Sequence, residues 1–193
     1  MTPASVLFGL FVTFVVTWFG AALWARQTVV ALPNRTLLSL YVSALAGSLL
    51  LVMSGLLIPA LRVRIWEENA LLDWAMVVIN AMGLGWCWWA RIHLGSLWSA
   101  GVSRKEGHRV IDTGSYGIVR HPIYTGGFIA IFSWAAACAS PIALLIALFT
   151  TVGFTCKAYL EERFLREEFG GSYEAYRQRV PMLVPFLRPR SSS

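Results

Sequence analysis

The sequence predicts an all-α integral membrane protein, a bundle of about five transmembrane helices. Of its 193 residues, 57% are hydrophobic and 13% are charged, whereas a soluble domain is about 45–50% apolar and about 25% charged. Five long apolar segments account for most of the hydrophobic residues. The nine tryptophans agree with this class, because indole rings favour the membrane–water interface.

The apolar segments set the positions of the expected helices. Four of the five have about the 20 residues that a spanning helix needs. The first has no basic residues before it and is too long for the core of a signal peptide, so we expect a retained transmembrane helix. The segments run over residues 5–24, 36–61, 70–89, 123–138 and 142–159.

The fourth and fifth segments are expected to form a tight helical hairpin. The fourth is short, and the sequence "CASPIA" (residues 138–143) follows it directly. Proline is favoured in the first turn of a helix, because its missing N–H would have no partner there. Pro141 therefore predicts the start of the fifth helix.

The basic residues predict the orientation of these helices. With the N-terminus outside, fourteen of the sixteen Lys and Arg residues fall on the cytoplasmic side, as the positive-inside rule requires. We therefore expect a multi-pass protein with its N-terminus outside and its C-terminus in the cytoplasm. The same clustering beside apolar segments argues against nucleic-acid binding, because the basic residues form no separate basic face.

Several site classes are excluded by spacing. The cysteines all lie inside apolar segments and match no zinc motif. No two histidines stand three or four residues apart, so we expect no metal site. The "GLG" at 83–85 lies inside an apolar segment with no strand before it, so it is no dinucleotide fingerprint. The residues concerned are Cys87, Cys138, Cys156, His93, His108 and His121.

Most ionisable groups lie in two cytoplasmic stretches, residues 91–122 and 157–187. In the first, glycines at 107 and 114 predict turns, and Pro122 biases His121 away from helix. An extended backbone there leaves N–H and C=O groups open to a ligand, and a flat heteroaromatic with polar edges, such as adenine, would suit it. The alternative is an interfacial loop with anchoring Arg and Tyr side chains.

The second stretch is predicted to continue the fifth helix with one polar face. Lys157, Glu161 and Glu168 recur at helical spacing and share that face. Acidic groups such as Glu161 and Glu162 are costly at a membrane boundary unless they pair or face a polar site. Pairing with Lys157 or Arg120 is one account, and binding the ammonium group of a ligand is the other.

Two blocks resemble the isoprenylcysteine carboxyl methyltransferase family. "EGHRVIDTGSYGIVRHPIYTGG" (106–127) is similar to its cofactor segment, and "EERFLREEFGGSYEAYRQRVPMLVPF" (161–186) to its C-terminal segment. They occur in the family's order with a helical hairpin between them, and the resemblance extends from Leu94 to Phe186. It implies a membrane methyltransferase that holds S-adenosylmethionine in a cytosolic pocket formed by the loop before the fourth helix and the C-terminal segment. We also expect a single domain over 1–193, with two N-terminal helices in 1–66 and a catalytic core in 67–193, and placement in a bacterial inner membrane.

The resemblance also implies roles for individual residues. Glu161 matches the acidic residue that contacts the cofactor, and Gly101 could contribute only backbone to such a contact. Arg120 and Lys157 are expected to orient the acceptor, and Arg120 and Glu161 are the expected catalytic residues. The other expected cofactor contacts are His108, Arg109, Val110, Ile111, Tyr116, His121, Pro122, Ile123 and Tyr124.

One departure concerns the acceptor. The prenylcysteine enzymes have an arginine four residues before the acidic position, and this chain has Lys157, which keeps the charge but lacks the bidentate fork. We expect carboxyl methylation of an isoprenylcysteine-like lipophilic or lipidated substrate that enters from the bilayer. The alternatives are a phospholipid or amine N-methyltransferase, a thiol S-methyltransferase, and, from another class, a non-catalytic membrane scaffold or transporter subunit.

Overall fold

The structure is a computed structural model of the chain. It describes residues 1–21, 28–31, 58, 63–67, 69–95, 103–105 and 110–187. The predicted second apolar segment, residues 36–61, lies almost entirely outside the described residues. The described helices are α1 (Pro3–Gly20), α3 (Ala70–Leu94), α4 (Pro122–Cys138), α5 (Pro141–Phe169) and α6 (Gly171–Arg179), with a short 3-10 turn, η4 (Gly114–Gly117).

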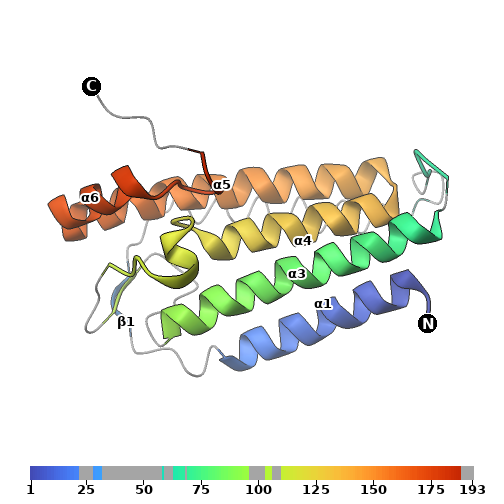
Figure 1. Cartoon of the computed structure of the whole chain (residues 1–193), viewed down its shortest axis with the longest axis horizontal. Helices are drawn as coiled ribbons and strands as arrows, with labels where there is room; N and C mark the ends of the chain where they lie inside the picture. The colour runs from blue at the N-terminus through green and yellow to red at the C-terminus, as the bar shows by residue number, and fades with distance from the viewer. Residues whose placement is uncertain are drawn as a thin grey trace.

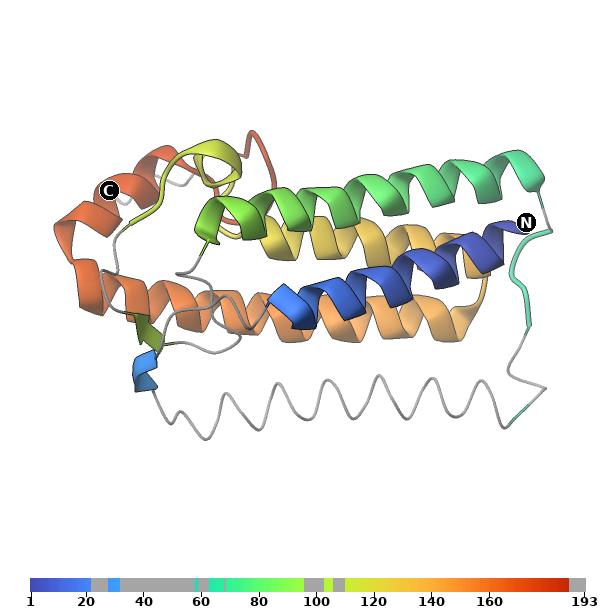
Figure 2. The same cartoon turned by 90° about the horizontal axis from the view of Figure 1, so that it is seen from below.

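The four long helices α1, α3, α4 and α5 lie side by side as a bundle (Figure 1). Helices α1, α3 and α5 run in one direction and α4 runs in the other (Figure 2). Three of them, α1, α3 and α5, are long and apolar enough to cross a membrane, and α4 is a shorter apolar helix. The predicted all-α membrane fold is confirmed. The helix directions place the segment before α4 and the segment after α5 at the same end of the bundle.

Capping residues fix where α1 and α3 begin. Thr2 and Ser5 exchange side-chain and backbone hydrogen bonds in a capping box at the start of α1. The Asn69 side chain accepts from the backbone N–H groups of Leu71 and Leu72 and caps α3. Helix α3 ends at Gly95, whose φ of +58° favours glycine.

The predicted hairpin between α4 and α5 is present. Helix α4 ends at Ala139, which has a left-handed backbone with a φ of 49°, and Pro141 occupies the first turn of α5. The Ala139 carbonyl accepts a hydrogen bond from the N–H of Ile65 at 2.8 Å, so the connection before α3 contacts this turn.

Helices α3 and α4 pack at backbone distance because two glycines face each other. A Cβ on Gly126 would lie 2.6 Å from the Gly83 carbonyl oxygen, and a Cβ on Gly83 would lie 2.8 Å from the Gly126 carbonyl oxygen. One turn away, the buried Asn80 amide donates to the Ala130 carbonyl at 2.7 Å. Small residues and interhelical hydrogen bonds are the usual means of joining helices in membranes.

Helix α5 continues without a break from its apolar part into the polar part that carries Glu161 and Glu162. It ends at Gly170, whose φ of +52° allows the chain to turn directly into α6. A short antiparallel pair of strands, β1 (Thr28–Ala31) and β2 (Ser103–Lys105), accompanies the helices. These features gather the polar segments at one end of the bundle.

Candidate functional site

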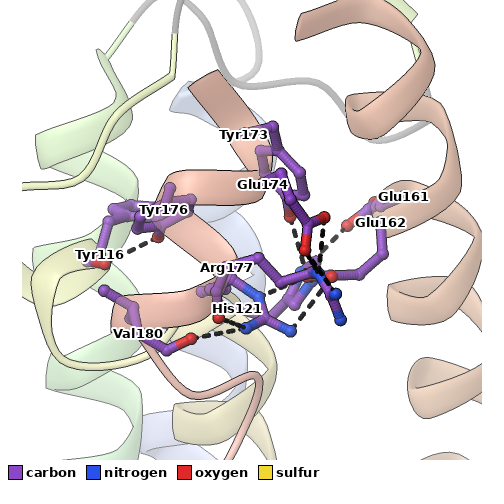
Figure 3. Close-up of polar contacts among 10 residues, drawn as sticks. Tyr116, His121, Glu161, Glu162, Tyr173, Glu174, Tyr176, Arg177 and Val180 are labelled. Atoms are coloured by element: carbon purple, nitrogen blue, oxygen red, sulfur yellow. Dashed lines mark hydrogen bonds and ion pairs between the residues drawn. The ribbon is translucent and has the colours of Figure 1, made fainter. Parts of the chain in front are cut away.

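The candidate site lies where α4 begins and α5 becomes polar. Three segments meet there: the wall, defined as residues 110–124; the polar end of α5; and α6 with the strap, defined as residues 180–187 (Figure 3). The groups described below come from these segments, apart from His93 at the end of α3 and Thr125 in the first turn of α4.

A glycine turn places Tyr116 within the wall. Gly114 has a φ of +59°, and a Cβ at this position would lie 2.7 Å from the ring of His93. The η4 turn that follows directs the Tyr116 ring against His93, with 6.5 Å between the ring centroids. The Tyr116 carbonyl accepts a hydrogen bond from the Tyr176 hydroxyl at 2.7 Å. Tyr116 is therefore held between α3 and α6.

His121 lies between two carboxylates. It precedes Pro122 and has a non-helical backbone (φ −123°, ψ 63°), as the sequence predicts. Its Nε2 lies 3.0 Å from Glu162 Oε1, and its Nδ1 lies 3.5 Å from Glu161 Oε2. Burial lowers the pKa of His121, but hydrogen bonds to Glu161 and Glu162 outweigh burial and hold this pKa above its ordinary value. The geometry therefore favours a protonated ring that donates from both nitrogens.

Glu162 is a buried carboxylate with several donors. Arg120 Nε donates to its Oε1 at 2.7 Å, and Arg120 Nη2 donates to its Oε2 at 3.1 Å, which is a bidentate pair. The Tyr173 hydroxyl from α6 donates to Oε1 at 2.8 Å, and His121 is the further partner. Of the two expected pairings, the one with Arg120 is thus made by Glu162.

The strap binds the wall through its backbone carbonyls. Arg120 Nη1 also donates to the carbonyls of Arg177 and Val180, at the end of α6 and the start of the strap. Three further strap carbonyls accept hydrogen bonds at 2.8, 3.0 and 2.6 Å. These are Pro181 from the N–H of Arg120, Met182 from the N–H of His121, and Leu183 from the hydroxyl of Thr125.

Glu161 has a different environment from its neighbour. The Tyr124 hydroxyl donates to Glu161 Oε1 at 2.8 Å, and Lys157 Nζ lies 4.0 Å from the same oxygen. The Lys157 ammonium also lies 5.7 Å from the centroid of the Tyr124 ring, within cation–π range. The Glu161 side chain is 22% exposed, whereas that of Glu162 is 3% exposed. Of this acidic pair, Glu161 is the one open to a ligand.

The position of His121 predicts a pH dependence of stability. A histidine whose pKa is raised on folding stabilises the fold fully below its unfolded pKa, near 6.5, and loses that contribution as pH rises through the folded value. We therefore expect the melting temperature in detergent to fall as pH rises above about 6.5. His121→Gln should flatten this part of the profile. A profile with the same slope in both proteins would contradict the interpretation.

Residues 74–167 match the sequence model of the isoprenylcysteine carboxyl methyltransferase (ICMT) family. This segment, just under half of the chain, is similar to that family. The resemblance to this family that the sequence indicated is thereby confirmed.

The relatives are named either methanethiol S-methyltransferases or protein-S-isoprenylcysteine O-methyltransferases. Methanethiol S-methyltransferase 1 of Bradyrhizobium diazoefficiens is 48% identical over 73 residues, which cover 38% of this chain and 25% of that protein. Protein-S-isoprenylcysteine O-methyltransferase B of Arabidopsis thaliana is 36% identical over 87 residues, covering 45% and 44%. Methanethiol S-methyltransferase of Pseudomonas deceptionensis is 30% identical over 163 residues, covering 77% and 60%. The chain thus matches a quarter to three fifths of the length of these relatives.

One solved structure shares the ICMT fold. The eukaryotic intramembrane Ras methyltransferase ICMT superposes with a TM-score of 0.56 at 22% identity, covering 82% of this chain and 55% of that one. At this identity the likeness shows the fold, and it agrees with the helical membrane bundle predicted from the sequence.

The structure brings together part of the site that was predicted from the sequence. Arg120, His121, Tyr124, Lys157 and Glu161 form one connected group of contacts. The remaining expected residues of the wall lie beside this group: Val110 packs against Tyr173, Tyr176 and Val180, and Ile111, Tyr116, Pro122 and Ile123 continue the wall. Gly101, His108 and Arg109 lie outside the described residues.

Tyr173 and Tyr176 were not expected at the site from the sequence, and Glu162 was expected there only as one of an acidic pair. Glu162, Tyr173 and Tyr176 are all buried and join α5 and α6 to the wall. The two tyrosines belong to the C-terminal block that resembles the ICMT family, which was the available signal for them. Among the described residues, no group of three or more His, Cys, Asp or Glu side chains is arranged to hold a metal ion.

Proposed function

We propose that this protein transfers a methyl group from S-adenosylmethionine to a lipophilic acceptor at one face of a membrane. The observation that carries the proposal is the meeting of the wall with the acidic end of α5 at one end of an apolar bundle. The match to the ICMT family and the names of the relatives support it. By the positive-inside rule, this end would face the cytoplasm of a bacterial inner membrane.

The residues present suit this cofactor. Its methionine part carries an ammonium group, and Glu161 is a partly exposed carboxylate that could accept hydrogen bonds from it. Glu162 already receives hydrogen bonds from three side chains and is closed to solvent. Tyr116, His121 and Tyr124 supply aromatic and polar surface for the adenosine, with the neighbouring wall residues beside them. When bound, the cofactor supplies an electrophilic sulfonium methyl group.

The chain itself would act mainly by positioning the reactants. A carboxylate or thiolate acceptor is already anionic and needs no strong base, so holding the two reactants in line is the main requirement. Lys157, which is mostly buried beside Tyr124 and Glu161, would orient an anionic acceptor arriving from the bilayer. The guanidinium N–H groups of Arg120 donate to Glu162 and to two backbone carbonyls. Its proposed role in orienting the acceptor is therefore indirect and passes through these partners.

An isoprenylcysteine-like carboxylate is the first acceptor we propose. A thiol is the second candidate, because Lys157 offers a point charge in place of the guanidinium fork that binds a carboxylate at two oxygens, and because several relatives are named methanethiol S-methyltransferases. Transfer of labelled methyl from S-adenosylmethionine into a panel of prenylcysteine analogues, thiols, fatty acids and phospholipids would identify the class. Methyl transfer to none of them, with no binding of S-adenosylmethionine, would overturn the proposal in favour of a non-catalytic scaffold or transporter subunit.

Glu161→Ala provides a direct test of the cofactor contact. We expect the affinity for S-adenosylhomocysteine to fall by about 1–3 kcal/mol, the usual value of a hydrogen bond to a charged group. Isothermal titration calorimetry in detergent measures the change. Glu167→Ala is the matched control, since Glu167 lies on the same helix in an exposed pair with Arg163, and it should leave the affinity unchanged. Equal affinities for the wild type and Glu161→Ala would remove Glu161 from the cofactor site.

A further inference from the structure

Two adjacent glutamates of α5 face different partners. Glu161 contacts Tyr124, Lys157 and His121 and is partly exposed, whereas Glu162 is almost fully buried. Successive residues of a helix point about 100° apart, so one of the pair can lie toward a ligand while the other lies behind it. Figure 3 shows both side chains beside His121 and α6.

Glu162 joins segments that are distant in the sequence. Its carboxylate accepts two hydrogen bonds from Arg120, one from His121 and one from Tyr173. Arg120 and His121 lie about 40 residues before it in the sequence, and Tyr173 lies on the next helix. Arg120 is in turn bound to the backbone of α6 and the strap. A buried carboxylate with this number of charged donors fixes the orientation of each of them.

A short series of contacts leads from Glu162 to the exposed glutamate. The His121 ring, held by Glu162 at Nε2, presents Nδ1 to Glu161 at 3.5 Å. The same ring stacks on Tyr124, with an angle of 10° between the ring planes and 5.6 Å between the centroids. The Tyr124 hydroxyl then donates to Glu161 at 2.8 Å. A rotation of His121 would therefore disturb two of the partners of Glu161, His121 itself and the Tyr124 stacked on it.

We propose that Glu162 is a positioning residue, which holds His121 so that His121 and Tyr124 present the Glu161 carboxylate to the ligand. It acts through these neighbours, because its own carboxylate is closed to solvent. The ligand part of this role rests on the proposed function, in which Glu161 meets the methionine ammonium group. The contacts of His121 do not rest on it.

The pH profile of ligand affinity separates positioning from a merely structural role. Within the part of the chain that the structure describes, the charged or titratable groups facing His121 are Glu161 and Glu162 from α5 and Tyr124 stacked on its ring. Arg120 lies beside it in the wall, and Tyr173 of α6 donates to the same Glu162 carboxylate. With Glu162 present, hydrogen bonding to two carboxylates favours the doubly protonated ring and holds the pKa of His121 above its ordinary value. With glutamine in its place, the ring loses an anionic acceptor and deprotonates at lower pH. A neutral ring has a single N–H, so it no longer donates to both sides.

The experiment compares Glu162→Gln with the wild type in detergent, between about pH 6 and pH 8. S-adenosylhomocysteine affinity should be nearly flat in the wild type and should fall severalfold with rising pH in the variant. A loss that is the same at every pH would overturn the proposal, because a merely structural defect weakens binding uniformly. Glu167→Gln is the matched control on the exposed face of the same helix, and it should retain the flat profile.

A second measurement needs no ligand. In protein labelled at histidine with carbon-13, the ring signal of His121 is assigned by its loss in His121→Gln and titrated by NMR. Its midpoint should shift to lower pH in Glu162→Gln and stay in place in Glu167→Gln. An unshifted midpoint in Glu162→Gln would overturn the proposal. If S-adenosylhomocysteine binds to neither protein, the proposed function fails, while this titration still decides the contact.

Glu162→Asp keeps the test valid should the glutamine variant fail to fold. Aspartate retains the charge that Arg120 requires but withdraws the carboxylate from His121 by one methylene. We expect folded protein with a lowered His121 midpoint and a ligand affinity that falls as pH rises. A wild-type midpoint together with a flat affinity profile in Glu162→Asp would show that His121 does not depend on the position of this carboxylate.

Discussion

Replacing Arg120 by methionine is expected to lower the free energy of unfolding by about 3–5 kcal/mol, the cost of removing one partner of a buried ion pair. Arg120 and Glu162 have side chains that are 7% and 3% exposed, and they are joined by two hydrogen bonds. The change would leave the Glu162 carboxylate without its main partner and the Val180 carbonyl without a donor. Denaturant or thermal unfolding in detergent measures the loss.

Arg163→Met is the matched control for this prediction. Arg163 also pairs with a glutamate of α5, Glu167, but both side chains are well exposed, and such pairs contribute about 0–1 kcal/mol. Combining Arg120→Met with Glu162→Gln should recover part of the stability, because the unpaired charge is then removed. Equal losses in Arg120→Met and Arg163→Met would show that the buried pair contributes no more than a surface pair.

A methyl group at the contact of α3 and α4 is expected to cost about 1–3 kcal/mol of stability, the usual range for overpacking. In Gly126→Ala, the new Cβ would lie 2.6 Å from the Gly83 carbonyl oxygen and 2.8 Å from Cys87 Sγ. Neither atom lies at the end of a long flexible side chain, so the helices themselves must separate. Because α4 also begins with the wall, we expect weaker ligand binding together with a lower melting temperature.

The adjacent glycine supplies the control for this substitution. A Cβ on Gly127 meets no atom within 4 Å, and alanine is better than glycine in a helix by about 0.8–1.0 kcal/mol. Gly127→Ala should therefore leave the stability unchanged or raise it slightly. A Gly126→Ala protein that is as stable as Gly127→Ala would mean that α3 and α4 are not held at backbone distance.

Much of the bundle could be predicted because its signals are local. Pro141 marks the start of α5, and the apolar segments mark where α1, α3 and the apolar part of α5 lie. The turn at Gly114 and the extended backbone at His121 follow in the same way from one glycine and one proline. Such features depend on a few neighbouring residues, which the sequence shows directly.

The different partners and exposure of Glu161 and Glu162 could not be predicted in this way. The two residues are chemically identical and adjacent, and which of them faces Arg120 depends on how α5 is rotated against the wall and α6. That rotation results from packing among residues up to about 60 positions apart. The sequence therefore indicated an acidic pair and its possible partners but not which partner belongs to which glutamate.

The contacts of the strap could not be predicted either, because they are made by backbone carbonyls. Pro181, Met182 and Leu183 accept hydrogen bonds from the wall through groups that every residue has. No side-chain pattern distinguishes a segment that offers its carbonyls to a distant partner from one that offers them to water. The family resemblance included this segment, but the physical reason for its presence becomes visible in the folded chain.

These carbonyls also set the order in which the protein can be completed during synthesis. Arg120 leaves the ribosome's catalytic centre 60 residues before Val180, a delay of about 3–12 s at about 5–20 residues per second. During that interval α4 can already enter the membrane, but the backbone of the wall has none of its strap partners. The chain order therefore allows the helices before the strap to enter the membrane first, and the hydrogen bonds between the wall and the strap can form only after the chain has returned from α6.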